Sequence, residues 1–316
     1  MIIILARPRG FCDGVVRAIA TVELELQLHG APAYVLHEIV HNRHVVENLR
    51  QRGALFVESI DEVPPGGLVI FSAHGVPEPL FRQAEQRRLR VVDATCPLVK
   101  RVHFRARRYS RAGNEVVIIG HEGHPEVEGT KGWIEGQWHI VSTAPEVERI
   151  HVQNPSAVSY VTQTTLNAKH TCKIIGALRR RFPTIVGPEL ADICHATQSR
   201  QAAVKSLTRR IDLLLVVGSE SSSNSNRLRE VGEQGGCPSY LIEDADRLDP
   251  SWLSNLECIG VTAGASAPEV LVQGVVDRIM ETAPATVLEM DDTFASTHLA
   301  AGAGGRFITD GTPHGM

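Results

Sequence analysis

The sequence predicts an α/β protein made of three similar units, with mainly parallel sheets around a pseudo-threefold axis and a central cavity. The first observation is that apolar runs of four to six residues alternate with helical stretches along the 316-residue chain, which is typical of parallel α/β units. The second is a layout that recurs at long period. A cysteine in a turn directly precedes an expected helix at Cys12, Cys96 and Cys194, and polar turns follow each of the three.

The first unit spans residues 1–96 and contains Cys12. Two of its apolar strands end in polar turns, which carry His41 and His74. We expect a helix at residues 15–28 and strands at residues 33–36, 68–71 and 89–92.

The second unit, residues 97–193, has Cys96 at its start. Pro97 suits the first position of a helix, where a missing N–H costs nothing. The two polar turns of this unit carry His124, Glu126, Thr164 and Thr165. The expected elements are a helix after Pro97, strands at 115–119, 139–141, 157–161 and 184–186, and a helix at 168–181.

The third unit, residues 194–281, has Cys194 at its start. Its polar turns carry Ser222, Ser223, Asn224 and Ser266. The expected elements are helices at 198–210 and 270–282 and strands at 213–217, 240–242 and 258–262. We expect the C-terminal tail, residues 282–316, to return to the first unit.

The spacing within the three units is regular. The first polar turn lies 29 residues after the cysteine at His41, 28 at His124 and 28 at Ser222. The second turn lies 62, 68 and 72 residues after the cysteine, at His74, Thr164 and Ser266. Because ligands of parallel α/β sheets bind beyond the carboxyl ends of the strands, this spacing predicts that the three cysteines and six turns line one cavity.

Composition excludes several classes of protein. With 43% hydrophobic residues the chain can fill several cores, so a disordered protein is excluded. A formal charge of -4 and a pI near 6.4 predict no partnership with nucleic acid or a membrane surface. No secretion signal is recognisable and no apolar run is long enough to span a bilayer. Six cysteines without a C-x-x-C pair are too sparse for a disulfide scaffold. These features predict a soluble cytoplasmic protein.

The three turn cysteines predict a metal centre. A helix N-terminus favours the thiolate, the form that acts as nucleophile or metal ligand. Three thiolates can bind zinc with water as the fourth ligand. They can also hold an iron–sulfur cube that leaves one iron without a protein ligand. The residues alone do not decide between the zinc site and the iron–sulfur cube. Cys172, Cys237 and Cys258 fall in helix or strand segments and are expected in cores.

The polar turns predict an anion site. Because the net charge offers no excess of cations, an anion here would be bound by imidazoles, hydroxyls, an amide and backbone N–H groups at helix starts. Such a lining suits a diphosphate. Glu126 lies two residues after His124, and its pKa would rise in a closed cavity, which suits a proton donor.

Several motifs together are specific enough to suggest a family. The chain closely resembles 4-hydroxy-3-methylbut-2-enyl diphosphate reductase over about residues 1–281. The motifs that carry the resemblance are Gly10-Phe-Cys12, Ser72-Ala-His74-Gly75, Asp93-Ala-Thr-Cys96-Pro97-Leu, Gly120-His-Glu-Gly-His124-Pro-Glu126, Thr162-Gln-Thr164-Thr165, Ser222-Ser-Asn224-Ser and Val261-Thr-Ala-Gly-Ala-Ser266.

The resemblance implies roles for individual residues. One [4Fe-4S] cluster per chain would be held by Cys12, Cys96 and Cys194, with one iron open to the substrate. Catalysis would involve Glu126 as the start of a proton relay, Thr164 as the group that orients the substrate hydroxyl, and His124. The substrate-binding residues would be His41, His74, His124, Thr164, Thr165, Ser222, Ser223, Asn224 and Ser266.

The reaction implied is a two-electron reductive dehydroxylation that gives isopentenyl and dimethylallyl diphosphates, the final step of the methylerythritol phosphate route to isoprenoids. A ferredoxin or flavodoxin would donate the electrons. Three alternatives remain at this point: a cluster hydro-lyase that dehydrates without net electron transfer, a divergent cluster-bearing paralogue that senses diphosphates, and a zinc hydrolase.

Overall fold

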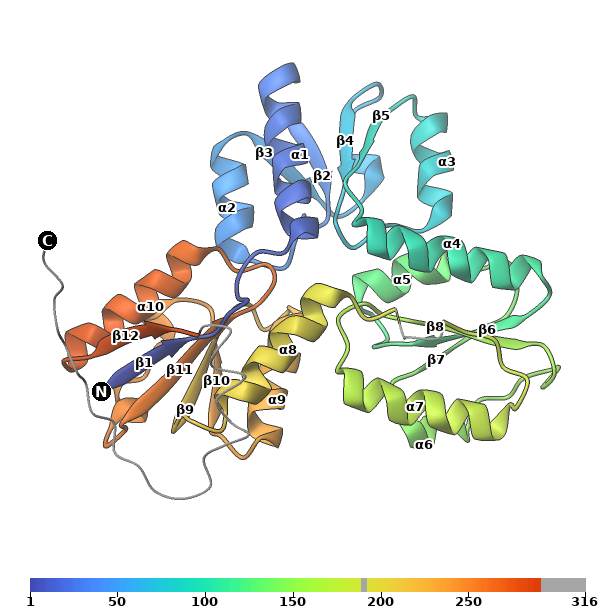
Figure 1. Cartoon of the computed structure of the whole chain (residues 1–316). Coiled ribbons are helices and arrows are strands. Elements are labelled where there is room, and N and C mark those ends of the chain that lie inside the picture. Colours follow the sequence, from blue (N-terminus) through green and yellow to red (C-terminus); the bar gives the residue numbers. More distant parts are fainter. Residues whose placement is uncertain (189–191, 291–316) are drawn as a thin grey trace, which may run out of the picture.

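Three parallel β-sheets, each covered by helices on both faces, make up the described part of the chain (Figure 1). The structure, a computed structural model, describes residues 1–188 and 192–290. Within these residues the strand pairs are parallel. The predicted α/β class with three parallel units is confirmed. We call each sheet with its covering helices a lobe.

The first lobe contains a four-stranded sheet in the order β3 (Ala54–Val57), β2 (Ala33–Leu36), β4 (Leu68–Phe71) and β5 (Arg90–Asp93). One face is covered by α1 (Asp13–His29) and α2 (Arg43–Gln51), the other by the 3-10 helix η1 (Ile60–Glu62) and α3 (Glu78–Gln86). Successive strand residues point to opposite faces, so Val35 packs with α1 and α2 whereas Leu36 packs on the α3 side.

The second lobe contains a three-stranded sheet in the order β7 (Trp138–Val141), β6 (Glu115–Ile119) and β8 (Val158–Thr162). The helices of its two faces are α4 (Pro97–Arg111) with α5 (Pro125–Lys131), and α6 (Ala144–Val147) with α7 (Ala168–Arg181). The strand expected at 184–186 is wrong, because only Val186 forms a bridge, with Ser159. Pro183 and Pro188 flank it and lack the N–H that a longer ladder needs.

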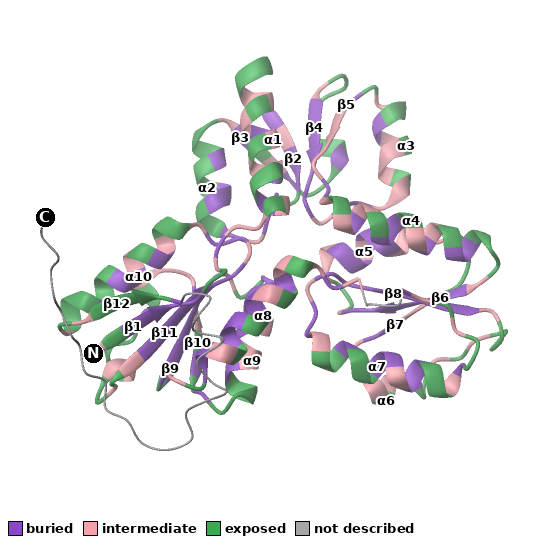
Figure 2. Cartoon of the chain, viewed as in Figure 1, coloured by how far each residue is buried: buried purple, intermediate pink, exposed green. Residues whose placement is uncertain are grey.

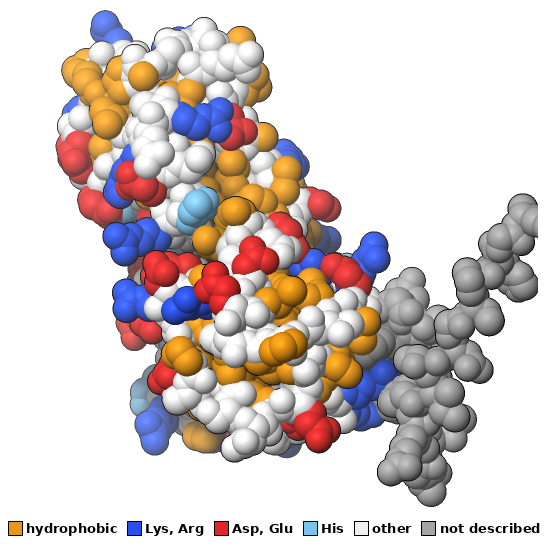
Figure 3. Space-filling view, turned by 90° about the vertical axis from the view of Figure 1, so that its left-hand side faces the viewer, with side chains coloured by type: hydrophobic (Ala, Val, Ile, Leu, Met, Phe, Trp, Pro, Cys, Tyr) orange, Lys and Arg blue, Asp and Glu red, His pale blue; other side chains and the backbone are white. Residues whose placement is uncertain are grey.

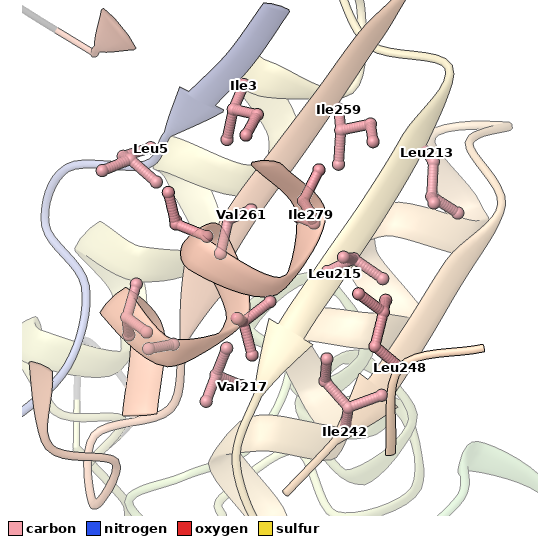
Figure 4. Close-up of a cluster of buried hydrophobic side chains, with 14 of the residues drawn as sticks. Ile3, Leu5, Leu213, Leu215, Val217, Ile242, Leu248, Ile259, Val261 and Ile279 are labelled. Carbon is pink, nitrogen blue, oxygen red and sulfur yellow. The ribbon is translucent and has the colours of Figure 1, made fainter. Parts of the chain in front are cut away.

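The third lobe contains a five-stranded sheet in the order β10 (Ser239–Ile242), β9 (Leu213–Val217), β11 (Cys258–Ala263), β1 (Ile2–Leu5) and β12 (Thr286–Glu289). Its helices are α8 (His195–Leu207), α9 (Ser223–Gln234) and α10 (Glu269–Thr282), with the 3-10 helices η2 (Ala245–Arg247) and η3 (Pro250–Leu253). Ile3, Val261 and Ile279 belong to the core between the sheet and α10 (Figure 4).

The first strand lies in a different lobe from the one expected. Residues 1–96 were assigned to the first unit, yet β1 pairs with β11 and β12 in the third lobe. Buried Ile3 and Ile4 belong to the cores of its two faces, and a strand buried on both faces needs a neighbour on each side. The tail was expected to return to the first unit; its described part forms β12, which pairs with β1 in the third lobe. Residues 291–316 lie outside the described residues, and the limits 1–96, 97–193 and 194–281 stay a prediction as folding units.

Each cysteine of interest lies where the chain passes from one lobe to the next. Cys12 connects β1 to α1, Cys96 connects β5 to α4, and Cys194 precedes α8. All three are the residue directly before the helix. The three helices begin near the centre of the molecule, where the lobes meet (Figure 1). Figure 2 shows that the strands around this centre are mostly buried, whereas the outer helix faces are exposed.

Candidate functional site

The backbone around the three cysteines has the same arrangement in each lobe. The N–H of each cysteine donates to a carbonyl in one of the predicted polar turns. The acceptors are Ala265 for Cys12 (3.2 Å), Ala73 for Cys96 (3.0 Å) and Thr164 for Cys194 (3.0 Å). These bonds hold the turn with Ser266, the turn with His74 and the turn with Thr164 beside the cysteines.

The space between the sulfur atoms is kept open by a glycine. A Cβ atom at Gly14 would lie 2.9 Å from the Sγ of Cys96 and 3.8 Å from the Sγ of Cys12. Any larger residue would therefore occupy the space beside two sulfurs. Within the described residues, no three histidine, cysteine or acidic side chains are arranged to hold a metal ion. Three soft thiols beside a space without side chains fit the donor set of a metal–sulfide cluster.

Two of the thiols have opposing influences on their acidity. The backbone N–H groups at the helix starts lower the pKa of Cys96 and of Cys194, as expected, but burial raises it by more. Burial acts in this direction because desolvation disfavours the charged form. Thr197 donates to the Sγ of Cys194 through its N–H (3.2 Å), and its hydroxyl lies 3.1 Å from that sulfur. A bound cation would therefore have to displace protons from these thiols.

Three histidines form a cluster in the same cavity as the sulfurs. The rings of His41 and His74 are stacked with centroids 4.1 Å apart, and His124 meets them edge-on at 5.8 and 6.3 Å. Burial and the neighbouring imidazoles lower the pKa of His74 well below its usual value and that of His124 to about 4. Glu126 donates its N–H to the Nδ1 of His124 (3.2 Å). The neutral ring of His124 thus carries its proton on Nε2, where it is a donor.

Buried polar atoms without partners line the same space. The Nε2 of His41 and both polar atoms of the Asn224 side chain are buried without a hydrogen-bond partner. Asn224 is 3% exposed. Because buried polar groups are nearly always hydrogen-bonded, these atoms are suited to binding a polar group that enters the cavity.

The hydroxyl side chains also hold the lobes together. Ser222 accepts from the N–H of Ser225 (3.3 Å) at the start of α9. Ser266 donates to the carbonyl oxygen of His41 (2.9 Å), which joins the third lobe to the first. The hydroxyls of Thr165 and Ser223 accept from a shared donor described below. Ser222 therefore caps α9.

Glu126 and Thr164 form a buried pair. One carboxyl oxygen of Glu126 accepts the N–H of Thr164 at 2.7 Å, and the other lies 3.1 Å from its hydroxyl. Glu126 is 3% exposed, and burial raises its pKa to about 7, although the bonds from Thr164 lower it. A carboxyl group that titrates near neutrality is suited to proton transfer.

One cavity contains every residue that the sequence singled out. It lies at the centre of the three lobes and receives the cysteines together with the polar turns. Its lining includes Cys12, Cys96, Cys194, His41, His74, His124, Glu126, Thr164, Thr165, Ser222, Ser223, Asn224 and Ser266. Of the remaining cysteines, Cys237 is buried and Cys258 is half-buried, but Cys172 is exposed on α7, contrary to expectation.

Sequence reasoning missed two polar residues around the cavity. Gln163 donates to the hydroxyls of Thr165 (2.8 Å) and Ser223 (3.1 Å), and it accepts the N–H of His121 (3.1 Å). It therefore links the second lobe to the third. Its place between two polar threonines was the available signal.

The other missed residue is Arg200 on α8, which is 4% exposed. Its guanidinium donates to the carbonyl oxygens of Gly10 (2.7 Å) and Phe11 (3.2 Å), so it holds the segment that leads to Cys12. Nothing in the sequence around Arg200 distinguished it from solvent-exposed arginines.

Comparisons with known proteins give a consistent result. A model of the LytB protein family matches residues 3–280. The 4-hydroxy-3-methylbut-2-enyl diphosphate reductase of Zymomonas mobilis is 54% identical over 289 residues, which cover 92% of this chain and 85% of that protein. The protein of the same name from Bordetella pertussis is 56% identical over 288 residues, which cover 91% and 89%.

Solved structures of similar proteins share the fold. The E-1-hydroxy-2-methyl-but-2-enyl-4-diphosphate reductase of Plasmodium falciparum superposes with a TM-score of 0.87 at 36% identity, over 92% of each chain. A structure of (E)-4-hydroxy-3-methyl-but-2-enyl diphosphate reductase, described as the terminal enzyme of the non-mevalonate pathway, gives a TM-score of 0.63 at 32% identity, over 89% of this chain and 100% of the other.

Proposed function

The chain belongs to the LytB protein family, and on that basis we propose how its central cavity carries out the reduction that its relatives' names describe. Its activity is that of a reductase of 4-hydroxy-3-methylbut-2-enyl diphosphate, at the end of the methylerythritol phosphate route to isoprenoids. The reaction replaces the allylic C–O bond by a C–H bond, consumes two electrons and two protons, and releases water. The products are isopentenyl and dimethylallyl diphosphates.

Cys12, Cys96 and Cys194 are the proposed ligands of one [4Fe-4S] cluster. When bound, such a cluster supplies electrons one at a time and an iron without a protein ligand, which acts as a Lewis acid. The proposal is supported by the equivalent positions of the three thiols and by the open space beside Gly14. The observation that carries it is that these thiols share one cavity with the histidine cluster and the Glu126–Thr164 pair.

The diphosphate is bound by neutral donors in this proposal. The Nε2–H of His124, the amide of Asn224 and the ring of His41 face the cavity, and α9 begins at its wall. A helix N-terminus favours an anion. In the free cavity burial lowers the pKa of His74 and His124, so these two rings are neutral when the diphosphate enters, and its negative charge then raises their pKa. The remaining contributors are His74, Thr165, Ser222, Ser223 and Ser266.

Glu126 and Thr164 are the proposed proton-handling pair. Thr164 orients the substrate hydroxyl, and Glu126 delivers a proton through it as the C–O bond breaks. The 3.1 Å hydrogen bond between the two side chains supports this order of transfer, and the N–H of Thr164 holds the carboxyl group in place at 2.7 Å. Burial supports it too, because the closed site keeps water away from the reacting carbon.

Electron supply and location follow from the chemistry. A ferredoxin or flavodoxin is the proposed electron donor, since the chain holds no second redox cofactor in this proposal.

The free thiols of the six cysteines support a reducing compartment such as the cytoplasm. No nucleic acid or membrane is a proposed partner. In the described part of the chain, no helix combines the length and the apolar character that a membrane span requires.

Anaerobic purification followed by iron and sulfide analysis tests the proposal. We expect about four iron and four sulfide per chain and product formation that depends on added reductant. Turnover without any reductant indicates a hydro-lyase instead. Cluster and diphosphate binding without product indicates a paralogue that senses diphosphates, and zinc without iron or sulfide contradicts the cluster.

A further inference from the structure

Helix α4, which begins directly after Cys96, is strongly basic. It spans Pro97–Arg111 and contains no acidic residue. The chain as a whole carries a formal charge of -4, so the charge of this helix is a local feature. Its basic residues are Lys100, Arg101, Arg105, Arg107, Arg108 and Arg111.

Among the described residues, two of these cations have no carboxylate partner. Lys100 pairs with Asp93 at 2.7 Å, and Arg105 pairs with Asp192. The two remaining paired cations, at positions 107 and 111, share the carboxylate at position 135. Among the ion pairs of the described residues, none involves Arg101 or Arg108.

The unpaired arginines flank an exposed aromatic ring in a surface groove. Arg101 and Arg108 are exposed, and Phe104 between them is 57% exposed. With Pro97, Lys100 and Arg105 they line one groove, which we call the α4 groove. At 1.5 Å per residue, Phe104 lies about 12 Å along the helix from Cys96. The groove therefore starts beside a proposed cluster ligand and stays close to it.

The face shown in Figure 3 lacks this concentration of one sign. On the face shown in Figure 3, acidic and basic side chains are interspersed. Helix α10 on that side of the molecule has both Arg278 and Glu281, which pair at 2.8 Å. The α4 groove thus differs from these surfaces both in charge and in its exposed aromatic residue.

We propose that the α4 groove is the docking surface for an acidic one-electron donor, a small iron–sulfur or flavin protein. This rests on the proposed function, in which two electrons per turnover enter from outside. Each docking event oxidises the donor and reduces the cluster by one electron, and the protons come from solvent through Glu126. Arg101 and Arg108 attract the acidic surface, as charged patches do in steered association, and Phe104 supplies the apolar contact that such interfaces favour at their centre.

Charge reversal of the groove tests the proposal. The variant Arg101→Glu/Arg108→Glu is compared with the wild-type holoenzyme and with Arg180→Glu, which changes an exposed arginine on α7, on the other face of the same sheet. Turnover is driven either by a reduced plant-type [2Fe-2S] ferredoxin or by reduced methyl viologen, a small reductant that needs no docking surface. Binding of the oxidised ferredoxin is measured in parallel by calorimetry at low and high salt.

For the double variant we expect the KM and the Kd for ferredoxin to rise roughly tenfold or more at low salt, with a weaker salt dependence. The viologen-driven rate and the iron content should match the wild type, and Arg180→Glu should resemble the wild type throughout. The proposed docking surface is contradicted if the Kd for ferredoxin is unchanged in the double variant. It is also contradicted if Arg180→Glu weakens ferredoxin binding as much as the double variant does. Double-stranded DNA that binds the groove as tightly as ferredoxin does contradicts it too.

The two proposals fail in different ways. If the wild-type holoenzyme gives no product with either reductant, the reductase mechanism is overturned. The docking surface is still decided in that case, because calorimetry compares ferredoxin binding by the wild type and the variants. The variant Phe104→Ala provides a second decision, because it alters no charge. Phe104→Ala should weaken ferredoxin binding by the same factor at high salt and at low salt. Unchanged binding would contradict the proposal that the Phe104 ring contacts the donor.

Discussion

The carboxyl group of Glu126 has its chemistry set by burial. Among the described residues no cation forms an ion pair with it, and its hydrogen-bond donors there are the N–H and hydroxyl of Thr164. Burial therefore raises its pKa to about 7 from an ordinary value of 4.5. The protonated form is the proton donor, so the group is competent below this pKa and loses its proton as the pH rises through it.

Glu126→Gln should keep the cluster and substrate binding but lose most turnover. The amide can replace the carboxyl in both contacts with Thr164, yet it carries no transferable proton, and loss of a general acid costs about 100-fold or more in kcat. The wild-type kcat should fall as the pH rises above about 7, whereas the residual rate of the variant should lack that step. Near-normal kcat in the variant, with iron and sulfide content unchanged, contradicts the role.

Gly14→Ala should reduce the iron and sulfide content without unfolding the protein. The new methyl group would lie 2.9 Å from the Sγ of Cys96, whereas alanine is favoured over glycine by up to about 1 kcal/mol within a helix. The matched control is Gly176→Ala on α7, where the methyl group would meet only the Nη1 of Arg180 at 3.6 Å. Full cluster content in Gly14→Ala, measured by iron and sulfide analysis beside thermal unfolding, is the result that contradicts this account.

At the scale of elements, the site depends on bonds between turns of different lobes. Gln163, at the end of β8, joins the second lobe to the third through Ser223 and fixes the turn at His121. Ser266 similarly binds the backbone of His41. The walls of the cavity are therefore held in place relative to one another by few, buried side chains.

Gln163→Leu should loosen the wall between β8 and α9. Three half-buried partners lose their hydrogen bonds, and an unsatisfied group costs about 1–3 kcal/mol when it is fully buried. We expect a lower free energy of unfolding and a severalfold higher KM for the diphosphate, with cluster content retained. Gln83→Leu is the control, because its bond to Asp61 is exposed (3.2 Å). Equal effects of the two substitutions on KM, measured by steady-state kinetics, count against a specific role for Gln163.

The residues of the polar turns could be predicted from the sequence, whereas their burial and their contacts with distant parts of the chain could not. The cysteine-to-turn spacings predicted that His41, Glu126 and Ser266 share one cavity, because each turn follows an apolar strand and parallel strands end at the same edge. The thiol pKa values were not predictable, since burial depends on packing by other lobes. Arg200 was missed for the same reason: its partners lie about 190 residues away in the chain.

At the scale of the whole molecule, the lobes do not follow one another simply along the chain. The N-terminal strand was expected with the segment that follows it, but β1 lies between β11 and β12. A strand's own residues show that it is buried, yet they do not show which strands it pairs with. Strands β1 and β12, which lie near the two ends of the described chain, are consequently neighbours in the sheet of the third lobe.

Ile3→Ala should destabilise the third lobe and spare the first. Ile3 is fully buried against the α10 side of the third sheet, and truncation of such a residue costs about 2–5 kcal/mol. Hydrogen exchange should show lost amide protection in β9 and β11, whereas β2 and β4 stay protected. Val35→Ala, also fully buried but in the first lobe, should give the reverse pattern. Loss of protection in β2 and β4 on Ile3→Ala contradicts the assignment of β1 to the third lobe.

The position of β1 also has a consequence for biosynthesis. Cys12 is synthesised about 250 residues before Ala265, which accepts its N–H, and before β11 and β12, the partners of β1. The first lobe can fold during translation, while the segment that carries Cys12 is held in place only after the strands of the third lobe have been made. The three sulfurs therefore come together after the third lobe has been synthesised, and a cluster that needs all three is assembled after that point.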